Sequence, residues 1–537
     1  MAIRNANSEA SLATGIYPWQ GAISISHKGY AMNLAVIYSR AILGVNAPLI
    51  TIEVHISEGL PGFTIVGLPE TSVKEAKDRV RSALMNSNFI MPAKRITVNL
   101  GPADLPKEGS RYDLPIALAI LIASQQIAAG KHSKLEFIGE LSLAGELRSC
   151  RGTIPSIIAA KMAQRCSVIS QVNGHEAALI NNANCFTATN LLEVCAHLND
   201  QQTLPPAQRI PTQQCKNASQ NIDMQDIIGQ HTAKRALEIC AAGSHNLLLF
   251  GPPGTGKTML ASRLTSIQPD MTEQEALECA AIKSISGNEF VAQDWCKRPF
   301  RTPHHTTSAV ALVGGGRNPR PGEITLAHNG VLFLDELPEY QRKALDALRE
   351  PLEAGEITIS RANQQVEYPA RFQLIGALNP SPSGFYDNNK FGGNSAQVAK
   401  YLSKLSGPFL DRFDLTIEVP ALPKGSLTEQ GQRGEPSQKI KHRVSAAQVK
   451  QRQRSGKLND ALSNKEIDKY CPLQHQDAVF LEMAIAKMGL STRAFHKIIK
   501  VARTIADLAD EANITKSHLL EALSYRAMDR LQQQINC

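Results

Sequence analysis

A glycine-rich loop between an apolar run and a helix-like segment constrains this chain more than any other feature. The apolar run is Leu247–Phe250, and the loop that follows it reads Gly-Pro-Pro-Gly-Thr-Gly-Lys-Thr. A strand, such a loop and a helix start form a phosphate-binding loop, in which backbone N–H groups surround the phosphates of a nucleotide. The context disfavours an ordinary glycine turn. The candidate nucleotide-binding residues are Gly251, Pro252, Pro253, Gly254, Thr255, Gly256, Lys257 and Thr258.

Two side chains of this P-loop, together with an acidic pair, predict the rest of an ATPase site. Lys257 supplies a point charge to the phosphates, and the Thr258 hydroxyl can ligate Mg²⁺. A second apolar run, Val331–Leu334, ends in Asp335 and Glu336. We expect Asp335 to hold Mg²⁺ through water, and Glu336 to polarise the water that attacks ATP. Many strands end in acidic residues, but the distance of this pair from the P-loop along the chain supports its assignment to the ATPase site.

A third apolar run predicts one more group of the same site. It spans Phe372–Leu378 and ends in Asn379, a polar side chain suited to orient water from a neighbouring strand. Uninterrupted apolar runs are typical of parallel strands that are buried on both faces. The sequence therefore predicts an α/β core with a parallel sheet, and ATP and Mg²⁺ as its ligands.

Length and composition indicate a multidomain protein of the cytoplasm. The chain has 537 residues, and 43% of them are hydrophobic, which is enough for three or four cores. The apolar stretch Leu114–Ala123 is too short to cross a bilayer, and the N-terminus lacks a signal-like segment. The ten cysteines form no Cys-x-x-Cys pair, so we expect reduced thiols. A net charge of +8 does not by itself indicate nucleic-acid binding.

Changes in composition divide the chain into six segments. The first lacks apolar periodicity, and we expect it to be a disordered N-terminal extension. Two stretches rich in Gln and Pro are predicted to be linkers. Near the C-terminus apolar residues recur at helical spacing, which predicts a helical domain. The segments are the extension 1–31, a domain 32–199, the linker 200–225, a core 226–420, the linker 421–437 and a helical domain 438–537.

A series of short motifs identifies a family. In chain order they lie at residues 59–63, 66–70, 102–109, 251–258, 299–305, 322–331 and 407–414. They include Pro-Phe-Arg-Thr-Pro-His-His and Leu-Asp-Arg-Phe-Asp. With them, the span from Met32 to about Leu531 resembles the ComM/YifB group of magnesium-chelatase-like AAA+ ATPases. The resemblance implies an AAA+ α/β core, a helical lid at 438–537 and assembly as a homo-hexamer.

The same resemblance gives roles to three residues. Asn379 is similar to the sensor that contacts the γ-phosphate. Arg412 resembles the arginine finger that one subunit inserts into its neighbour's site, where positive charge stabilises the transition state. Arg493 resembles the sensor arginine of the lid. The alternatives are a surface ion pair of Arg412 with Asp411 or Asp414, and a solvated position at a helix start for Arg493.

Two segments resemble the loops that line the pore of related ring ATPases. They are residues 312–322, which resemble a helix-2 insert, and the hairpin-like residues 355–367. Their arginines are DNA-binding candidates because guanidinium groups pair with phosphates; the alternative is a solvated turn. Residues 439–457 carry seven Lys or Arg and no acid, which suits either nucleic-acid binding or a soluble linker. The sequence shows no row of aromatic residues that could stack on bases, so we do not expect sequence-specific binding. The candidates are Arg317, Arg320 and Arg361.

The sequence argues against a metal centre other than Mg²⁺. Adjacent His304 and His305 do not face one way on a helix, and no further ligand stands at the required spacing. We favour a structural or nucleotide-coupling role for them. Many relatives of this family carry a Cys-rich segment after the sensor asparagine, whereas residues 379–384 here contain serines. We therefore predict no structural zinc.

Residues 32–199 resemble a Lon-protease/ribosomal-S5-like α+β domain. A peptidase of that type needs a serine nucleophile and a lysine base. Ser110 is present, but the corresponding second loop, residues 151–156, has no lysine, and the first lacks the Pro-Ser-Ala-Gly sequence. Proteolysis is therefore disfavoured, and a role in binding a partner or DNA, or in orienting the ring, is favoured.

Three hypotheses follow for the function. The first is an ATP-hydrolysing hexameric ring motor on single-stranded and branched DNA, without sequence specificity, promoting branch migration during natural transformation. The second is a chelatase-type AAA+ motor that remodels a protein partner. The third, disfavoured above, is an ATP-dependent protease.

Overall fold

The N-terminal part of the molecule is a mixed sheet covered by helices. The computed structural model describes residues 33–128, 130–208, 222–287, 294–316, 319–361, 364–379, 395–423 and 434–536. The sheet has the order β3-β4-β2-β1-β5-β8-β9, in which β2 is antiparallel to β1 and β4, and the other neighbours are parallel. The strands are β1 (Leu34–Arg40), β2 (Leu49–Ser57), β3 (Gly62–Val66), β4 (Arg95–Gly101), β5 (Leu135–Phe137), β8 (Cys166–Ser170) and β9 (Cys185–Ala188).

The apolar stretch that is too short to span a bilayer forms the central helix of this N-terminal unit. It is α3 (Asp113–Ala123), in which every residue is buried, and it packs on β1 and β2. Strand β2 alternates buried and more exposed residues because only one of its faces meets α3. The remaining elements are α1 (Thr71–Lys74), α2 (Ala76–Asn86), β6 (Glu140–Leu141), β7 (Leu147–Arg148), α4 (Thr153–Met162), α5 (Gly174–Ala177) and α6 (Leu191–Leu198). The Lon-like assignment of this unit remains a prediction.

A buried ion pair ties the middle of this sheet together. The Arg40 guanidinium donates to both carboxylate oxygens of Glu136 at 2.7 Å, and Arg165 Nε lies 3.1 Å from Glu136 Oε1. The Glu136 side chain is wholly buried, and that of Arg40 is 8% exposed. Removing one partner of such a pair leaves a buried charge without compensation.

Glu136→Ala is therefore expected to destabilise the N-terminal unit by about 3–5 kcal/mol. Urea unfolding, followed by tyrosine absorbance and circular dichroism, measures this change. The matched control is Glu58→Ala, because Glu58 forms an exposed pair with Lys94. The control is expected to change stability by less than about 1 kcal/mol. Equal losses in both variants would contradict this account of the buried pair.

The predicted parallel sheet is present in the second part of the chain. All neighbouring strands are parallel, in the order β11-β14-β17-β10-β18. Alternate residues of the central strands enter two apolar clusters, so both faces of the sheet are buried. The strands are β10 (Leu247–Phe250), β11 (Phe300–Arg301), β14 (Val331–Leu334), β17 (Gln373–Leu378) and β18 (Leu415–Glu418).

Helices and two small hairpins surround this sheet. Helix α7 (His231–Gly243) and α8 (Lys257–Ile267) pack together on one face. The hairpins are β12 (Gly314–Gly315) with β13 (Arg320–Pro321), and β15 (Glu356–Arg361) with β16 (Gln364–Pro369). The other helices are α9 (Glu273–Ser286), α10 (Ala309–Val313), α11 (Glu323–Leu326), α12 (Arg342–Asp346), α13 (Arg349–Ala354), α14 (Ser395–Leu402) and α15 (Gly407–Leu410).

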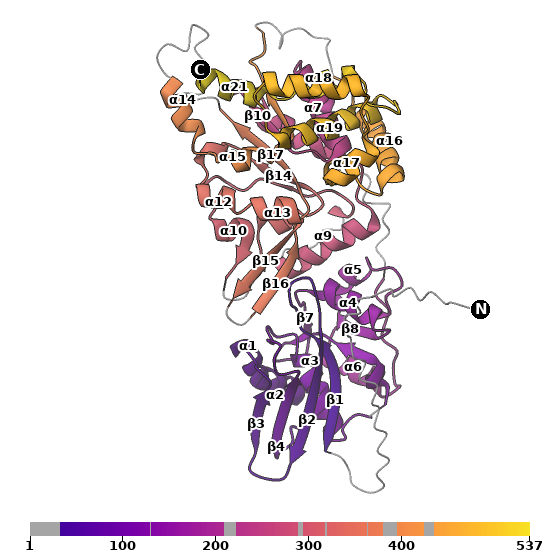
Figure 1. The fold of residues 1–537 in the computed structure, drawn as a ribbon. Helices are drawn as coiled ribbons and strands as arrows, with labels where there is room; N and C mark the ends of the chain where they lie inside the picture. Colours follow the sequence, from indigo (N-terminus) through magenta and orange to yellow (C-terminus); the bar gives the residue numbers. More distant parts are fainter. Residues whose placement is uncertain are drawn as a thin grey trace, which may run out of the picture.

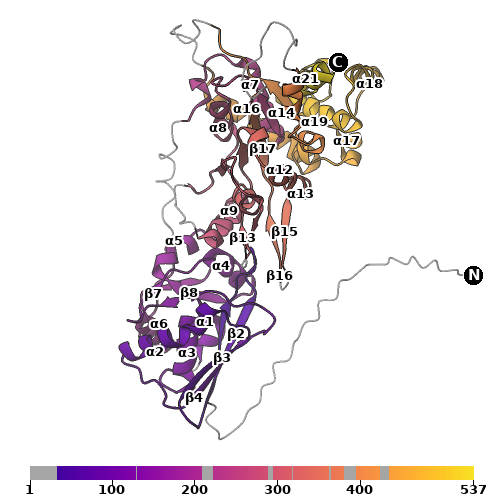
Figure 2. The same ribbon diagram turned by 90° about the vertical axis from the view of Figure 1, so that its left-hand side faces the viewer.

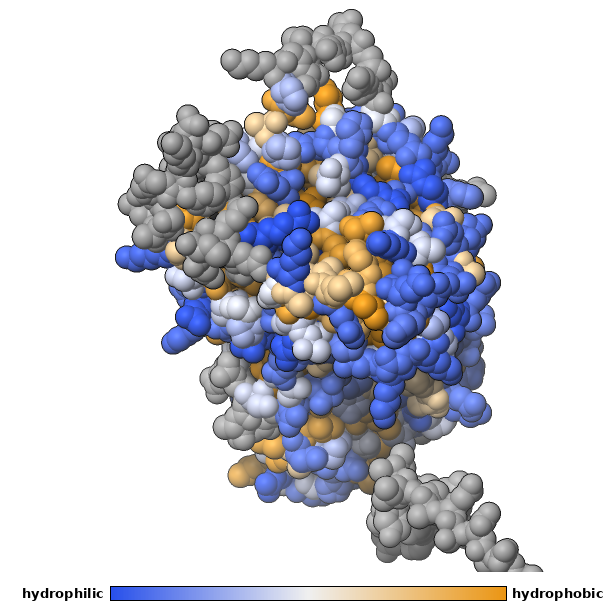
Figure 3. Space-filling model, turned by 45° about the horizontal axis from the view of Figure 1, so that its top comes forward, coloured by the Kyte–Doolittle hydropathy of each residue, from blue (hydrophilic) through white to orange (hydrophobic). Residues whose placement is uncertain are grey.

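The C-terminal part is helical, as predicted, and forms the upper end of the molecule in Figure 1. Val479 and Met483 of α18 are exposed. Figure 3 views this end and shows a patch of apolar side chains near the middle of a mostly hydrophilic surface. In the part of the chain that the structure describes, no helix combines the length and apolar composition needed to cross a membrane. The helices are α16 (Ser437–Ser455), α17 (Asn464–Tyr470), α18 (His475–Lys487), α19 (Thr492–Leu508), α20 (Lys516–Ser524) and α21 (Ala527–Asn536).

The N-terminal unit contacts the part of the chain that holds the parallel sheet. Apolar residues of α4 pack on α9, and Ser284 Oγ donates to Glu176 Oε2 at 3.0 Å. The β15–β16 hairpin extends towards the N-terminal unit (Figure 2). Gly44 lies so close to it that a Cβ would be 2.7 Å from Val366 Cγ1.

The predicted linkers are described only in part. The backbone N–H of Ala207 donates to Cys185 O at 2.9 Å, so the first residues of the stretch 200–225 pack along β9. In the second stretch, Ser437 already begins α16. The predicted N-terminal extension, residues 1–31, lies outside the described residues. The limits of the predicted segments remain predictions.

Candidate nucleotide site

The glycine-rich loop joins β10 to α8 at the carboxyl edge of the parallel sheet. Gly254 and Gly256 adopt φ values of +77° and +85°, which glycine accepts more readily than other residues. Lys257 is the first residue of α8, and no side chain caps this helix. The first N–H groups of a helix lack intrahelical acceptors, so this helix end can bind phosphate oxygens. The local geometry therefore fits the phosphates of a nucleotide.

The Lys257 ammonium lies inside the loop. Its Nζ donates to Gly251 O and Pro252 O, both at 2.8 Å, and to Asn379 Oδ1 at 3.0 Å. The residue is 7% exposed, and burial lowers the pKa of Lys257, whereas the nearby Asp335 carboxylate opposes that shift. A phosphate oxygen would be a charged acceptor in place of neutral ones, which makes a stronger hydrogen bond.

Thr258 and Asp335 meet although the sequence separates them widely. Thr258 Oγ1 donates to Asp335 Oδ2 at 2.7 Å. The contact forms because Asp335 follows β14 and Thr258 follows β10, and parallel strands end at the same edge of their sheet. A hydroxyl and a carboxylate side by side are oxygen ligands that suit Mg²⁺. The donor set thus fits the ion that we predict here.

Asn379 reaches the same place from β17, which lies between β10 and β14 in the sheet. Its contact with Lys257 Nζ places the predicted sensor at the P-loop. The structure therefore brings together Lys257, Thr258, Asp335 and Asn379. Their catalytic roles remain predictions.

Glu336 has a partner that sequence reasoning did not give it. Its φ of +51° is uncommon for a residue with a side chain, and such conformations gather at functional sites. His305 Nδ1 lies 3.3 Å from Glu336 Oε2. His305 follows β11, the strand next to β14, so adjacent strand ends explain the contact. Only the strand order, which the sequence does not reveal, could have predicted it.

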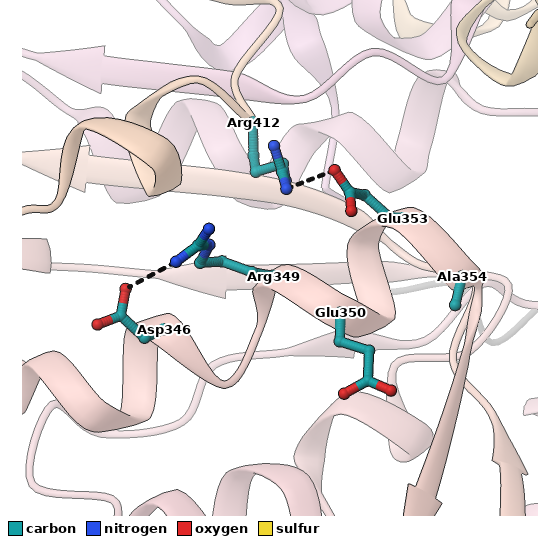
Figure 4. A pocket seen from close by; sticks show the side chains of 6 residues that line it. All are labelled: Asp346, Arg349, Glu350, Glu353, Ala354 and Arg412. Carbon is teal, nitrogen blue, oxygen red and sulfur yellow. Dashed lines mark ion pairs between the residues drawn. The ribbon is translucent and has the colours of Figure 1, made fainter.

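Arg412 lies at the opposite edge of the sheet from the P-loop. In the parallel pair of β10 and β18, Leu247 stands opposite Leu415, so Arg412 precedes the strands, whereas the P-loop follows them. Four residues of strand alone span about 13 Å. The Arg412 guanidinium pairs with Glu353, not with Asp411 or Asp414 (Figure 4).

The remaining candidates are not gathered at the P-loop. Arg493 is exposed in the first turn of α19. Arg320 is exposed on β13, and Arg361 is the last residue of β15. Arg317 lies outside the described residues. Burial raises the pKa of Glu108 in the N-terminal unit, and Arg320 opposes the shift, so Arg320 lies near that carboxyl.

A cluster of possible metal ligands lies where the parallel sheet meets the C-terminal helices. His245, Asp414 and Asp460 place one ligand atom each within 4.8 Å of one another. Lys497 Nζ lies 3.1 Å from Asp414 Oδ1, and Lys500 Nζ donates to Asp460 O at 2.7 Å. Burial lowers the pKa of His245 to about 4, so the imidazole is neutral near neutral pH. Burial and the nearby Asp414 carboxylate raise the pKa of Asp460 to about 7, and the Lys500 and Lys497 ammonium groups oppose this shift.

Comparison with known families agrees with this fold and site. Residues 223–427 match the family described as magnesium chelatase, subunit ChlI. Residues 52–173 match subunit ChlI of Mg-chelatase, and residues 434–526 match the ChlI C-terminal family. Together with the P-loop and the parallel sheet, these matches define a magnesium-chelatase-like AAA+ ATPase.

Full-length relatives narrow the class to a family. The chain is 57% identical to "Competence protein ComM" of Haemophilus influenzae, over 94% of this chain and 100% of that protein. It is 54% identical to "Uncharacterized protein YifB" of Escherichia coli, over 93% of this chain and 98% of that protein. The "Magnesium-chelatase 38 kDa subunit" of Cereibacter sphaeroides is 25% identical over 36% of this chain and 57% of that protein. The chain belongs to the ComM/YifB family.

Proposed function

We propose that the chain is an ATP-hydrolysing hexameric ring motor that acts on single-stranded and branched DNA. In this role it promotes branch migration while imported DNA is integrated during natural transformation. The position of Arg412 supports the ring: it lies across the sheet from the P-loop of its own subunit. The similarity to a protein named for competence, over 94% of this chain, supports action on DNA.

The proposed reaction is attack of water on the γ-phosphate of ATP. Glu336 accepts a hydrogen bond from that water and polarises it, and Asn379 orients it. Lys257 and the P-loop N–H groups hold the phosphates. Arg412 of the neighbouring subunit compensates the negative charge that shifts towards the leaving group. Mg²⁺, held by Thr258 and Asp335, would neutralise phosphate charge when bound.

His305 connects this chemistry to the proposed DNA-binding segment. It contacts Glu336, and the chain that follows it forms α10 and the β12–β13 hairpin with Arg320. Arg301, in β11, pairs with Glu323 at 2.7 Å, just after the same hairpin. A DNA strand that moves the hairpin would therefore act on the residues around Glu336.

The deciding experiment is ATPase rate with and without single-stranded, duplex and four-way-junction DNA. The Glu336→Gln protein serves as the blank because it keeps the site but lacks the carboxylate. We expect stimulation by DNA and ATP-dependent resolution of the junction. A rate that no DNA changes would contradict the proposal and favour a motor that remodels a protein. That second candidate is supported by the similarity to a magnesium-chelatase subunit over part of this chain.

The Arg320→Ala protein sharpens this test. We expect weaker binding to DNA of every sequence, and a slope of log affinity against log salt that is smaller by about 1, because one phosphate contact is lost. Fluorescence anisotropy at several salt concentrations measures both quantities. Arg342→Ala is the matched control, since Arg342 is 68% exposed on α12, and it should bind like the wild type. An unchanged slope for Arg320→Ala would remove Arg320 from the DNA contact.

A peptidase is not proposed. Ser110 Oγ donates to the Glu140 carboxylate, whereas a serine peptidase of the Lon type needs a lysine as the base. The neighbouring loop contributes the Arg151 carbonyl, which accepts a hydrogen bond from Arg111. These contacts are those of a structural cluster.

A further inference from the structure

A charged cavity of about 500 Å³ lies beside Arg412 (Figure 4). Helices α12 and α13 line one side of it, and the turn after α15, which carries Arg412, lines the other. Because Arg412 precedes β18, this cavity belongs to the sheet edge away from the P-loop of the same subunit. Its lining residues are Asp346, Arg349, Glu350, Glu353, Ala354 and Arg412.

Two arginines point into this space. Figure 4 shows the guanidinium groups of Arg349 and Arg412 on the same side of α13, whereas the Glu350 carboxylate points away from them. The Nε atoms of both arginines are buried, and neither has a hydrogen-bond partner among the described residues. Buried N–H donors are usually paired, because an unpaired one costs free energy. Because these Nε atoms are closed to solvent, an anion in the cavity would meet the outer Nη groups of the two arginines.

Each arginine has an acidic partner in the cavity, which is distant for Arg349 and in direct contact for Arg412. Arg349 Nη1 lies 4.0 Å from Asp346 Oδ1, and that oxygen already accepts a hydrogen bond from Ser406 Oγ at 2.9 Å. Glu353, the partner of Arg412, has a side chain that is 62% exposed. Ion pairs with exposed carboxylates contribute little, whereas arginine binds phosphate oxygens through two parallel hydrogen bonds. A triphosphate in the cavity would compete with both carboxylates for these guanidinium groups.

We propose that Arg349 is a second arginine that acts in trans, beside Arg412, on the triphosphate held by the neighbouring subunit. The inference rests on the proposed ring, in which Arg412 reaches the neighbour's P-loop. The occupant of the cavity is then the phosphate tail of a nucleotide bound to a second copy of this chain. Two guanidinium groups on one triphosphate stabilise the negative charge that shifts during hydrolysis.

The test mixes two full-length variants that each turn over ATP poorly. Lys257→Ala has a defective P-loop but keeps both arginines, and Arg349→Ala has an intact P-loop but lacks the second arginine. Arg349→Ala alone is expected to lose about tenfold or more in ATPase rate. Where a Lys257→Ala subunit faces the P-loop of an Arg349→Ala subunit, a complete site forms. In a random 1:1 mixture this is about one interface in four, so we expect recovery to about a quarter of the wild-type rate.

A second mixture, of Lys257→Ala with Arg412→Ala, distinguishes failure of this inference from failure of the ring on which it rests. Recovery with Arg412→Ala but not with Arg349→Ala would overturn the role of Arg349 and leave the ring intact. Recovery with neither would overturn both.

Two further variants exclude a folding defect. Arg349→Lys keeps a positive charge and is expected to retain part of the rate, and the binding of a fluorescent ATP analogue shows whether Arg349→Ala keeps a folded P-loop. Arg342→Ala, on the preceding helix, should keep the wild-type rate. If Arg349→Ala binds the analogue and turns over ATP as fast as Arg342→Ala, the inference is wrong.

Discussion

The Lys257→Ala protein is expected to lose ATP turnover by roughly 10²-fold or more, the size of effect that follows removal of one charge-stabilising donor. The reason is the place of this ammonium: it lies inside the P-loop, within 3.0 Å of two loop carbonyls and of Asn379 Oδ1. Alanine removes the positive charge and leaves those oxygens without a donor. Steady-state ATPase assays measure the loss, and titration with a fluorescent ATP analogue measures nucleotide affinity, which should fall as well.

Lys404→Ala is the control for this variant. Lys404 is half-exposed, and its Nζ lies 3.5 Å from Glu339 Oε1. Its replacement therefore removes a lysine charge from the same part of the chain without changing the P-loop. We expect the control to keep both the rate and the affinity of the wild type. Turnover in Lys257→Ala within a fewfold of the control would contradict the assignment of this loop as the ATP site.

The Arg412→Ala protein is expected to lose turnover by roughly 10³-fold, the loss that follows removal of an arginine finger, while it still binds ATP. The two effects separate because Arg412 and the P-loop lie at opposite edges of the sheet, so binding within one subunit does not involve this guanidinium. The same pair of measurements, ATPase rate and analogue titration, distinguishes the effects. A large loss of ATPase rate at an unchanged affinity for the analogue is the result that supports a role in hydrolysis.

Arg412→Lys completes this comparison. Lysine keeps the charge but not the planar, two-pronged donor, so we expect a rate between those of the wild type and the alanine variant. A wild-type rate in Arg412→Ala would contradict the finger. Loss of ATP binding in parallel with turnover would instead indicate a structural role, exerted through the pair with Glu353.

The local pattern of the sequence predicted the strands and the polar residues that end them. Each apolar run that precedes the P-loop, Asp335 or Asn379 is a strand of one parallel sheet. The prediction succeeds because a parallel strand buried on both faces must be apolar throughout, and because such strands share one carboxyl edge. The apolar runs alone are therefore enough to predict that the polar residues at the ends of these strands lie close together.

Contacts that depend on how strands and helices are ordered in space could not be predicted from the sequence. The pair of His305 and Glu336 exists because β11 lies next to β14, and the pair of Arg412 and Glu353 exists because α13 lies beside the turn after α15. Helical spacing in α19 predicted its apolar face. It did not predict that Arg503 and Asp507 are buried, which they can be because they pair with each other at 3.0 Å. No local pattern encodes such partners.

The residues that follow Arg412 also bind the C-terminal helical domain, the predicted lid. Asp414 accepts a hydrogen bond from the backbone N–H of Asn246, at the start of β10, and lies 3.1 Å from Lys497 of α19. Lys497 also donates to Phe413 O at 3.2 Å. A lid that tilts when its own subunit binds or releases nucleotide would therefore pull on the turn that carries Arg412. In the proposed ring, binding or release of nucleotide in one subunit would then move the Arg412 that serves the next subunit's site. The subunits would therefore hydrolyse ATP one after another and not independently.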